Sequence, residues 1–142
     1  LGTHAAADSG ADDLEDRVGA KLKGGVDLVV DNLAGTFIQK YLNMANLNAR
    51  IMVIGLLAGR AAEIQLGLLL FKQTRIEGVH VGKFSPEQAQ SAWVSIVETL
   101  NRAEARPLVD QVFPMGQVQE AFAHLRGGHL GKVLVDVASM SE

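Results

Sequence analysis

Two short turns hold the residue types of this chain that suit ligand binding. Asn32–Gly35 follows the apolar stretch Val26–Asp31, and Gly55–Leu57 follows Ile51–Ile54. An asparagine side chain can both donate and accept hydrogen bonds, and glycine lets a ligand approach the backbone closely. Asn and Gly also dominate ordinary turns, which is the alternative interpretation. Ligands of open parallel sheets bind beyond the carboxyl ends of the strands, so these turns are candidates for a binding site.

The sequence contains no residue pattern that indicates acid–base catalysis or metal binding. The chain contains no cysteine, which excludes disulfides and cysteine-ligated zinc within it. His80 and His124 have no partner at the spacing of a metal site or a catalytic triad, and we expect His124 to pack or to face solvent. No His-x-x-x-His, paired carboxylate or nucleophile elbow occurs. We therefore name no metal ligand and no catalytic residue.

Composition indicates a globular protein with a core. Of the 142 residues, 48% are apolar and 20% are charged. The net charge of −3 and the scattered lysines and arginines argue against nucleic acid as a partner. No apolar run approaches the ~20 residues that span a bilayer, and no signal peptide opens the chain. We expect no membrane partner and a cytoplasmic location. Because the sequence starts at Leu1 without a methionine, we interpret it as part of a longer protein.

Apolar spacing in the first half predicts a strand, a helix and a second strand. Val26–Asp31 is apolar on both faces, which is typical of a buried parallel strand. Thr36 with Gln39 predicts a capping box at the start of the helix that follows. Ile51–Ile54 is the second buried strand. Together they predict a βαβ crossover.

The second half predicts a long helix and then a strand, a helix and a strand. Ser85, with Pro at the next position and Gln three residues on, is a strong helix start. Trp93 falls on the apolar face of this helix, so we expect it in the core. The strands are expected at 109–113 and 133–137, with a helix at 117–125 between them.

Three stretches, taken in order and spacing, resemble the medium-chain dehydrogenase/reductase superfamily. The similarity is greatest to its zinc-independent quinone oxidoreductase branch, and Phe71–Gln73 before Arg75–Gly78 adds to it. The stretches are Gly25–Gly35, Arg50–Gly59, and Phe113–Phe122 with His129–Val135.

The resemblance implies an α/β fold, namely the second half of a Rossmann-type parallel sheet plus the C-terminal piece of a catalytic domain. The division expected is residues 1–105 for the dinucleotide-binding part and 106–142 for the catalytic piece. The family's glycine-rich phosphate fingerprint G-x-G-x-x-G does not occur in the chain. It would precede this segment, so the chain carries only half of a dinucleotide pocket.

The resemblance also implies the cofactor and the reaction. The enzyme would reduce a small-molecule quinone, activated alkene or carbonyl by hydride transfer from NAD(P)H, with NADP expected and NAD as the alternative. Because half of the pocket is missing, we expect the isolated chain to be inactive. For His129 the alternative interpretation is a surface-loop histidine, and for Lys132 it is a solvated lysine at a strand edge. The implied cofactor-binding residues are Asn32, Leu33, Gly35, Gly55, Leu56, Leu57, His129 and Lys132.

Two other interpretations stay open. A zinc-dependent alcohol dehydrogenase would take its metal ligands from outside this chain. A non-enzymatic α/β interaction module would have lost the cofactor function. The resemblance further implies a homodimer through an edge strand near Ala61–Leu68, because an unpaired edge invites pairing.

Overall fold

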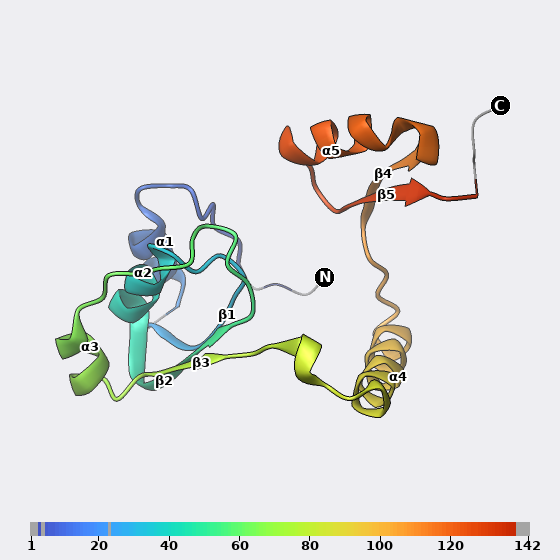
Figure 1. Ribbon diagram of the computed structural model, residues 1–142. Helices are drawn as coiled ribbons and strands as arrows, with labels where there is room; N and C mark the ends of the chain where they lie inside the picture. The colour runs from blue at the N-terminus through green and yellow to red at the C-terminus, as the bar shows by residue number, and fades with distance from the viewer. Residues whose placement is uncertain (1–2, 4, 23, 139–142) are drawn as a thin grey trace. The chain divides into compact units, whose positions relative to one another are not determined.

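The chain forms two compact units, which are described separately. The computed structural model describes residues 3, 5–22 and 24–138 (Figure 1). The first unit is Leu1–Phe84 and the second is Ser85–Glu142. The domain boundary expected from the sequence lies between residues 105 and 106. It concerns the domains of a parent enzyme and stays a prediction.

The first unit is built on a parallel sheet with the strand order β1-β2-β3. β1 has the bounds that the sequence predicts, whereas β2 starts earlier than predicted, directly after α2. The expected α/β class and the strand–helix–strand unit are confirmed. The elements are α1 (Leu14–Lys21), β1 (Val26–Asp31), α2 (Phe37–Met44), β2 (Ala45–Val53), α3 (Leu66–Phe71), β3 (Arg75–Gly78) and a 3-10 turn, η1 (Val81–Lys83).

Helix α2 packs on one face of this sheet and builds the core there. Its buried Ile38 and Leu42 pack with Ile51 of β2. On β1, however, Leu28 is 58% exposed and Val30 is 64% exposed. The prediction that β1 is buried on both faces is therefore wrong, because no described segment of this unit covers these two side chains. Partly buried residues around the core are Val29, Tyr41, Val53, Ile64 and Leu69.

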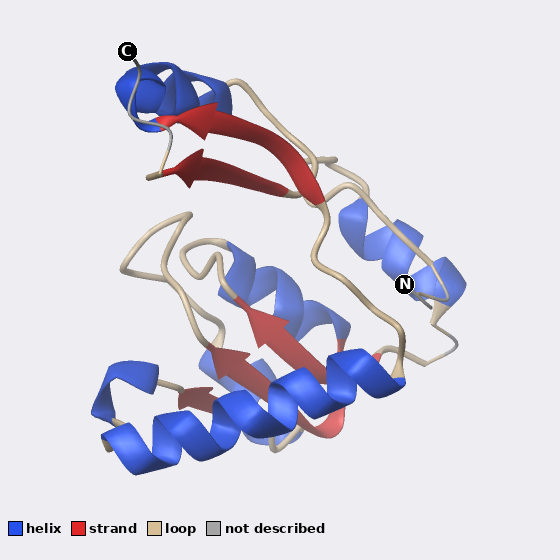
Figure 2. Cartoon of the chain, turned by 90° about the vertical axis from the view of Figure 1, so that its right-hand side faces the viewer, coloured by secondary structure: helices blue, strands red, loops and turns tan. Residues whose placement is uncertain are grey.

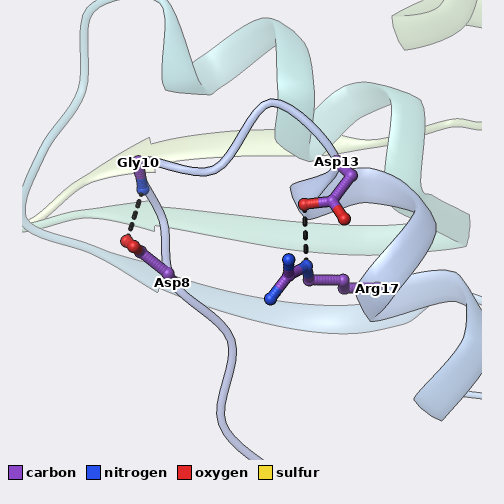
Figure 3. Close-up of polar contacts among 4 residues, drawn as sticks. All are labelled: Asp8, Gly10, Asp13 and Arg17. Atoms are coloured by element: carbon purple, nitrogen blue, oxygen red, sulfur yellow. Dashed lines mark hydrogen bonds and ion pairs between the residues drawn. The ribbon is translucent and has the colours of Figure 1, made fainter.

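The segment before β1 is held by local contacts (Figure 3). Asp8 accepts a hydrogen bond of 2.9 Å from the backbone N–H of Gly10. Arg17 donates a 2.7 Å hydrogen bond to Asp13 at the start of α1, and the two residues form an ion pair at positions i and i+4. Exposed pairs of this kind contribute little to stability. They order the chain locally, while the Asn43 side chain of α2 donates hydrogen bonds of 3.1 Å to the Glu15 carboxylate of α1.

The second unit contains a long helix and a smaller αβ element. β4 and β5 pair in parallel, and α5 lies against both strands, as Figure 2 shows near the C-terminus. Phe113 of β4 and Ala121 of α5 are buried between them. All four predicted elements of this half are confirmed. Their bounds are α4 (Pro86–Arg102), β4 (Val109–Pro114), η2 (Met115–Gln117), α5 (Val118–Arg126) and β5 (Lys132–Asp136).

The two predicted helix starts have opposite outcomes, because a capping box forms at α4 and the one predicted at α2 does not. At α4, Ser85 accepts from the backbone N–H of Gln88 at 3.3 Å, and the Gln88 side chain accepts from the Ser85 N–H at 2.8 Å. At α2, Thr36 is in the helical region and makes no capping hydrogen bond, so that prediction is wrong. The Gln39 side chain instead accepts a 2.7 Å hydrogen bond from the backbone N–H of Gln65. A contact distant in the sequence has replaced the local one.

Two further predictions about packing are wrong. Trp93 is 61% exposed, and no residue of α4 is buried. The sequence of α4 has an apolar face, but burial requires a packed neighbour, and no described part of its own unit buries this face. The segment Ala61–Leu68 holds no edge strand, because residues 61–65 are irregular and α3 begins at Leu66. The homodimer itself stays a prediction.

The helices are also short for a bilayer. Within the part of the chain that the structure describes, none is long and apolar enough to cross a membrane.

Candidate functional site

Two turns at the carboxyl ends of β1 and β2 lie against each other. The backbone N–H of Leu57 donates to the carbonyl of Asn32 at 3.1 Å, and that of Ala58 donates to the carbonyl of Leu33 at 2.7 Å. These bonds extend the pairing of the strands into the turns. The structure therefore brings together the residues that the sequence indicates in the first unit, namely Asn32, Leu33, Gly35, Gly55, Leu56 and Leu57.

The glycines of both turns are required by this close approach. A Cβ atom at Gly55 would lie 2.7 Å from the carbonyl oxygen of Asn32. One at Gly35 would lie 2.7 Å from the carbonyl oxygen of Ala58, and Gly35 also has a φ of +56°. Sequence reasoning assigned these glycines to contact with a ligand. The structure shows a second reason, which is contact of the two turns with each other.

Asp31 is a central residue of the site that the sequence reasoning missed. Its side chain is 1% exposed. Its carboxylate accepts hydrogen bonds from the backbone N–H of Leu33 at 2.8 Å, the N–H of Ala34 at 2.9 Å and the hydroxyl of Tyr41 at 3.0 Å. An Asp side chain that binds the backbone two residues on is a known turn pattern. Asp31 directly before Asn32 was the signal that could have indicated this.

The pKa of Tyr41 is raised by its position beside Asp31. Burial of the phenol, the hydrogen bond to Asp31 and the charge of Asp31, in that order, raise the pKa of Tyr41 to about 12. All three act against the phenolate. The hydroxyl therefore stays a hydrogen-bond donor to Asp31 throughout the neutral range.

Few backbone groups of the turns remain available to a ligand. The amides of Leu33 and Ala34 are bound to Asp31, and the carbonyls of Asn32 and Leu33 are bound to the second turn. Among the described residues, the backbone amides of Gly55 and Leu56 form no hydrogen bond, and neither does the exposed side chain of Asn32. Within the same described part of the chain, the amides of Asn32 and Gly35 in the first turn are also unbonded, so the second turn offers two amide donors and the first turn offers two amides and the Asn32 carboxamide.

An open pocket adjoins these donors at the carboxyl ends of β2 and β3. Its volume is about 580 Å³, and its walls are mainly apolar. Sequence reasoning left His80 without a role, yet His80 is the one ionisable side chain in this lining. An apolar pocket with few polar groups is typical of a small-molecule site. The lining residues are Val53, Ile54, Gly55, Leu56, Gly78, Val79 and His80.

His124 packs in the second unit, as expected, and it also has a polar partner that the sequence did not indicate. Its Nε2 lies 2.6 Å from Oδ2 of Asp110, and its ring also stacks at a tilt on Phe113 of β4. The hydrogen bond from His124 is the main cause that lowers the pKa of Asp110. The pair joins α5 to β4. Among the described residues, no nucleophilic side chain is hydrogen-bonded to His124, so the pair is a structural contact and not part of a catalytic triad.

The two remaining predicted residues also belong to the second unit. Nδ1 of His129 lies 3.1 Å from the carbonyl oxygen of Leu125, and the ring is exposed. Lys132 is exposed, and its backbone N–H donates to the carbonyl of Leu108 at 2.8 Å. Because the two units are described separately, a shared site between these residues and the turns of the first unit stays a prediction.

The residues present do not make a metal centre. No group of three or more His, Cys, Asp or Glu side chains that could hold a metal ion occurs in residues 3, 5–22 and 24–138. The complete sequence has no cysteine.

Comparison with known proteins shows one family. The model of the family described as zinc-binding dehydrogenase matches residues 1–135. Quinone oxidoreductase-like protein 2 of Bos taurus is 26% identical over 118 residues, which are 80% of this chain and 34% of that protein. The chain thus spans about a third of the length of this relative.

Solved structures share the fold. An NAD-dependent alcohol dehydrogenase is 20% identical with a TM-score of 0.72, over 89% of this chain and 36% of its own. CurA of Vibrio vulnificus, solved in complex with NADPH, is 19% identical with a TM-score of 0.72, over 91% of this chain and 42% of its own. The mixed α/β arrangement with parallel strands matches the C-terminal part of these dehydrogenases.

Proposed function

Because this chain belongs to the zinc-binding dehydrogenase family of the medium-chain dehydrogenase/reductase superfamily, we propose that it carries the nicotinamide half of an oxidoreductase cofactor site. The parent enzyme reduces a quinone, an activated alkene or a carbonyl of a small molecule in the cytoplasm. NADP is the preferred cofactor and NAD the alternative. The quinone oxidoreductase-like relative and the NADPH-bound neighbour support this proposal.

The observation that carries the proposal is the set of unpaired donors at the carboxyl edge of the sheet. The amides of Gly55 and Leu56 suit a carboxamide oxygen, and the side chain of Asn32 suits a carboxamide or a ribose hydroxyl. The residues present therefore fit the nicotinamide part. When bound, the cofactor supplies the hydride, and the chain contributes orientation and an apolar wall.

The division of the parent is part of the same proposal. Residues 1–105 supply the second half of the dinucleotide-binding domain, and 106–142 supply a piece of the catalytic domain. His129 and Lys132 contact the cofactor from the second unit. The pyrophosphate and the adenosine are held outside this chain, since it lacks the glycine-rich fingerprint.

A zinc-dependent alcohol dehydrogenase is the alternative enzyme. The described residues do not fit a zinc site, because they form no group that could hold a metal and the sequence has no cysteine. This alternative therefore requires all metal ligands from outside the chain.

A non-enzymatic interaction module is the alternative outside enzymology. The exposed Leu28 and Val30 on one face of the sheet favour it, because a stable partner could cover them. It predicts no response of the two turns to any nicotinamide compound.

The first experiment is an NMR titration of the chain with nicotinamide mononucleotide, and 2′,5′-ADP is the matched control. We expect the mononucleotide to shift the amide signals of Gly55 and Leu56, and the adenosine compound to leave them unchanged. Identical, absent or reversed responses contradict the nicotinamide assignment. The isolated chain should show no turnover with NADPH and a quinone, and measurable turnover would overturn that expectation.

We also propose that the protein is a homodimer through a sheet edge. Among the described strands, β3 is an outer strand of its sheet, in place of the segment Ala61–Leu68. Light scattering should give the mass of two chains, and the mass of one chain counts against the dimer.

A further inference from the structure

The carboxylate of Asp31 decides which backbone groups of the two turns a ligand can reach. It lies at the end of β1 and is 1% exposed. We propose that Asp31 is a positioning residue, which withholds the amides of Leu33 and Ala34 and thereby directs a nicotinamide carboxamide to the amides of Gly55 and Leu56. The inference rests on the function proposed above, from which the identity of the ligand is taken.

The two withheld amides are firmly bound. Leu33 donates to Oδ1 of Asp31 at 2.8 Å, and Ala34 donates to Oδ2 at 2.9 Å. All the groups around the carboxylate donate to it, which suits a side chain that only accepts. A buried carboxylate that loses its donors is strongly unfavourable. A ligand therefore cannot take these two amides without a large penalty.

The orientation of the first turn also fixes the second turn. With its amides held by Asp31, the first turn presents the carbonyls of Asn32 and Leu33 to the amides of Leu57 and Ala58. These bonds hold the second turn at Leu57 and Ala58, its later residues. The amides of Gly55 and Leu56, the first residues of this turn, form no hydrogen bond within the described residues. They are thus held in a fixed place before any ligand binds, which reduces the entropy lost on binding.

A variant of Tyr41 can separate two roles of Asp31, namely binding the turn amides and joining the turn to α2. Its hydroxyl joins Asp31 to α2 through Oδ1 at 3.0 Å, and it forms no hydrogen bond with a turn amide. Tyr41→Phe removes the tether and leaves both turn bonds. Asp31→Asn keeps an acceptor at one position but places a donor NH2 where Ala34 needs an acceptor.

The test compares the affinity of nicotinamide mononucleotide for the chain, for D31N and for Y41F by NMR titration. We expect D31N to bind roughly tenfold more weakly or worse, and Y41F to bind within about twofold of the unsubstituted chain. Unchanged binding by D31N overturns this inference alone. Equal losses in both variants also overturn it, because they indicate tethering. No binding by the unsubstituted chain overturns the proposed function and this inference with it.

A second measurement does not depend on whether D31N folds. In the unsubstituted chain, amide hydrogen exchange should be slow at Leu33 and Ala34 with or without the mononucleotide. The mononucleotide should slow exchange at Gly55 and Leu56 and leave exchange at Leu33 and Ala34 unchanged, and this contrast is expected if Asp31 withholds the first-turn amides from the ligand. Fast exchange at Leu33 and Ala34, or no ligand effect at Gly55 and Leu56 while the mononucleotide binds, overturns the inference.

Discussion

The hydroxyl of Tyr41 donates a 3.0 Å hydrogen bond to Oδ1 of Asp31, ten residues earlier in the chain. The bond joins α2 to the carboxyl end of β1, where the first turn of the site begins. Tyr41 is also the only tyrosine of the sequence. Its ionisation can therefore be followed by ultraviolet absorbance without interference from another phenol, and it reports directly on Asp31.

The first prediction concerns this ionisation. Tyr41 should titrate with a pKa of about 12 instead of the ordinary 10.0. In D31N the pKa should fall but stay above 10.0, because burial, the largest cause, remains while the charge is removed. A pKa unaffected by D31N would show that the carboxylate does not act on the phenol.

The same shift predicts a loss of stability in alkali. A pKa raised by folding means that the native state favours the neutral phenol, so this contribution is present below pH 10.0 and is lost as the pH rises to about 12. The difference in unfolding free energy between the unsubstituted chain and Y41F should shrink over that range. Denaturant unfolding at several pH values measures it, and a constant difference would contradict the prediction.

The second prediction concerns the contact between the turns. Gly55→Ala should destabilise the first unit by about 1–3 kcal/mol, because its Cβ would lie 2.7 Å from the backbone oxygen of Asn32. Gly78→Ala is the matched control at the end of β3, since a Cβ there meets nothing within 4 Å. Denaturant unfolding gives both values. Equal effects of the two variants would mean that the turns are not in close contact.

The third prediction concerns the C-terminus of α2. Lys72 donates to the carbonyls of Leu42 at 2.9 Å and Asn43 at 2.8 Å, and α2 has no basic residue in its own last turn. Lys72→Met should cost about 1–2 kcal/mol, because two carbonyls lose a charged donor. Lys83→Met should be neutral, because the Lys83 side chain is exposed and forms no hydrogen bond or ion pair with another described residue. A neutral Lys72→Met in thermal unfolding would show that water replaces the ammonium group.

The fourth prediction concerns acid stability of the second unit. The hydrogen bond from His124 lowers the pKa of Asp110 below its ordinary 3.8. A pKa lowered by folding gives stability that is present above pH 3.8 and is lost as the pH falls through the native pKa. Asp110→Asn should remove this acid dependence. Circular dichroism during acid titration tests it, with Asp136 left unchanged in both proteins.

A retained acid transition in Asp110→Asn would assign the effect to another carboxylate. Because both partners are partly accessible to solvent, added salt should weaken the difference between the two proteins.

The sequence alone determined where most helices and strands lie. The bounds of β1 and the capping box of α4 follow from residues within a few positions of each other. Apolar spacing and a Ser-Pro start act locally, so their effect is visible without the rest of the chain. The family was likewise indicated by the order of short motifs. The glycines at 35 and 55 were recognised as special, although for contact with a ligand rather than between turns.

Only the tertiary structure decided which polar groups are paired and which apolar groups are buried. Asp31 meets Tyr41 ten residues away, His124 meets Asp110 fourteen residues away, and Lys72 caps a helix thirty residues earlier. Trp93 lies on an apolar face yet is exposed, because no described part of its own unit covers it. Hydrogen bonding and burial depend on what the fold brings alongside a residue. Periodicity describes a face but does not provide its partner.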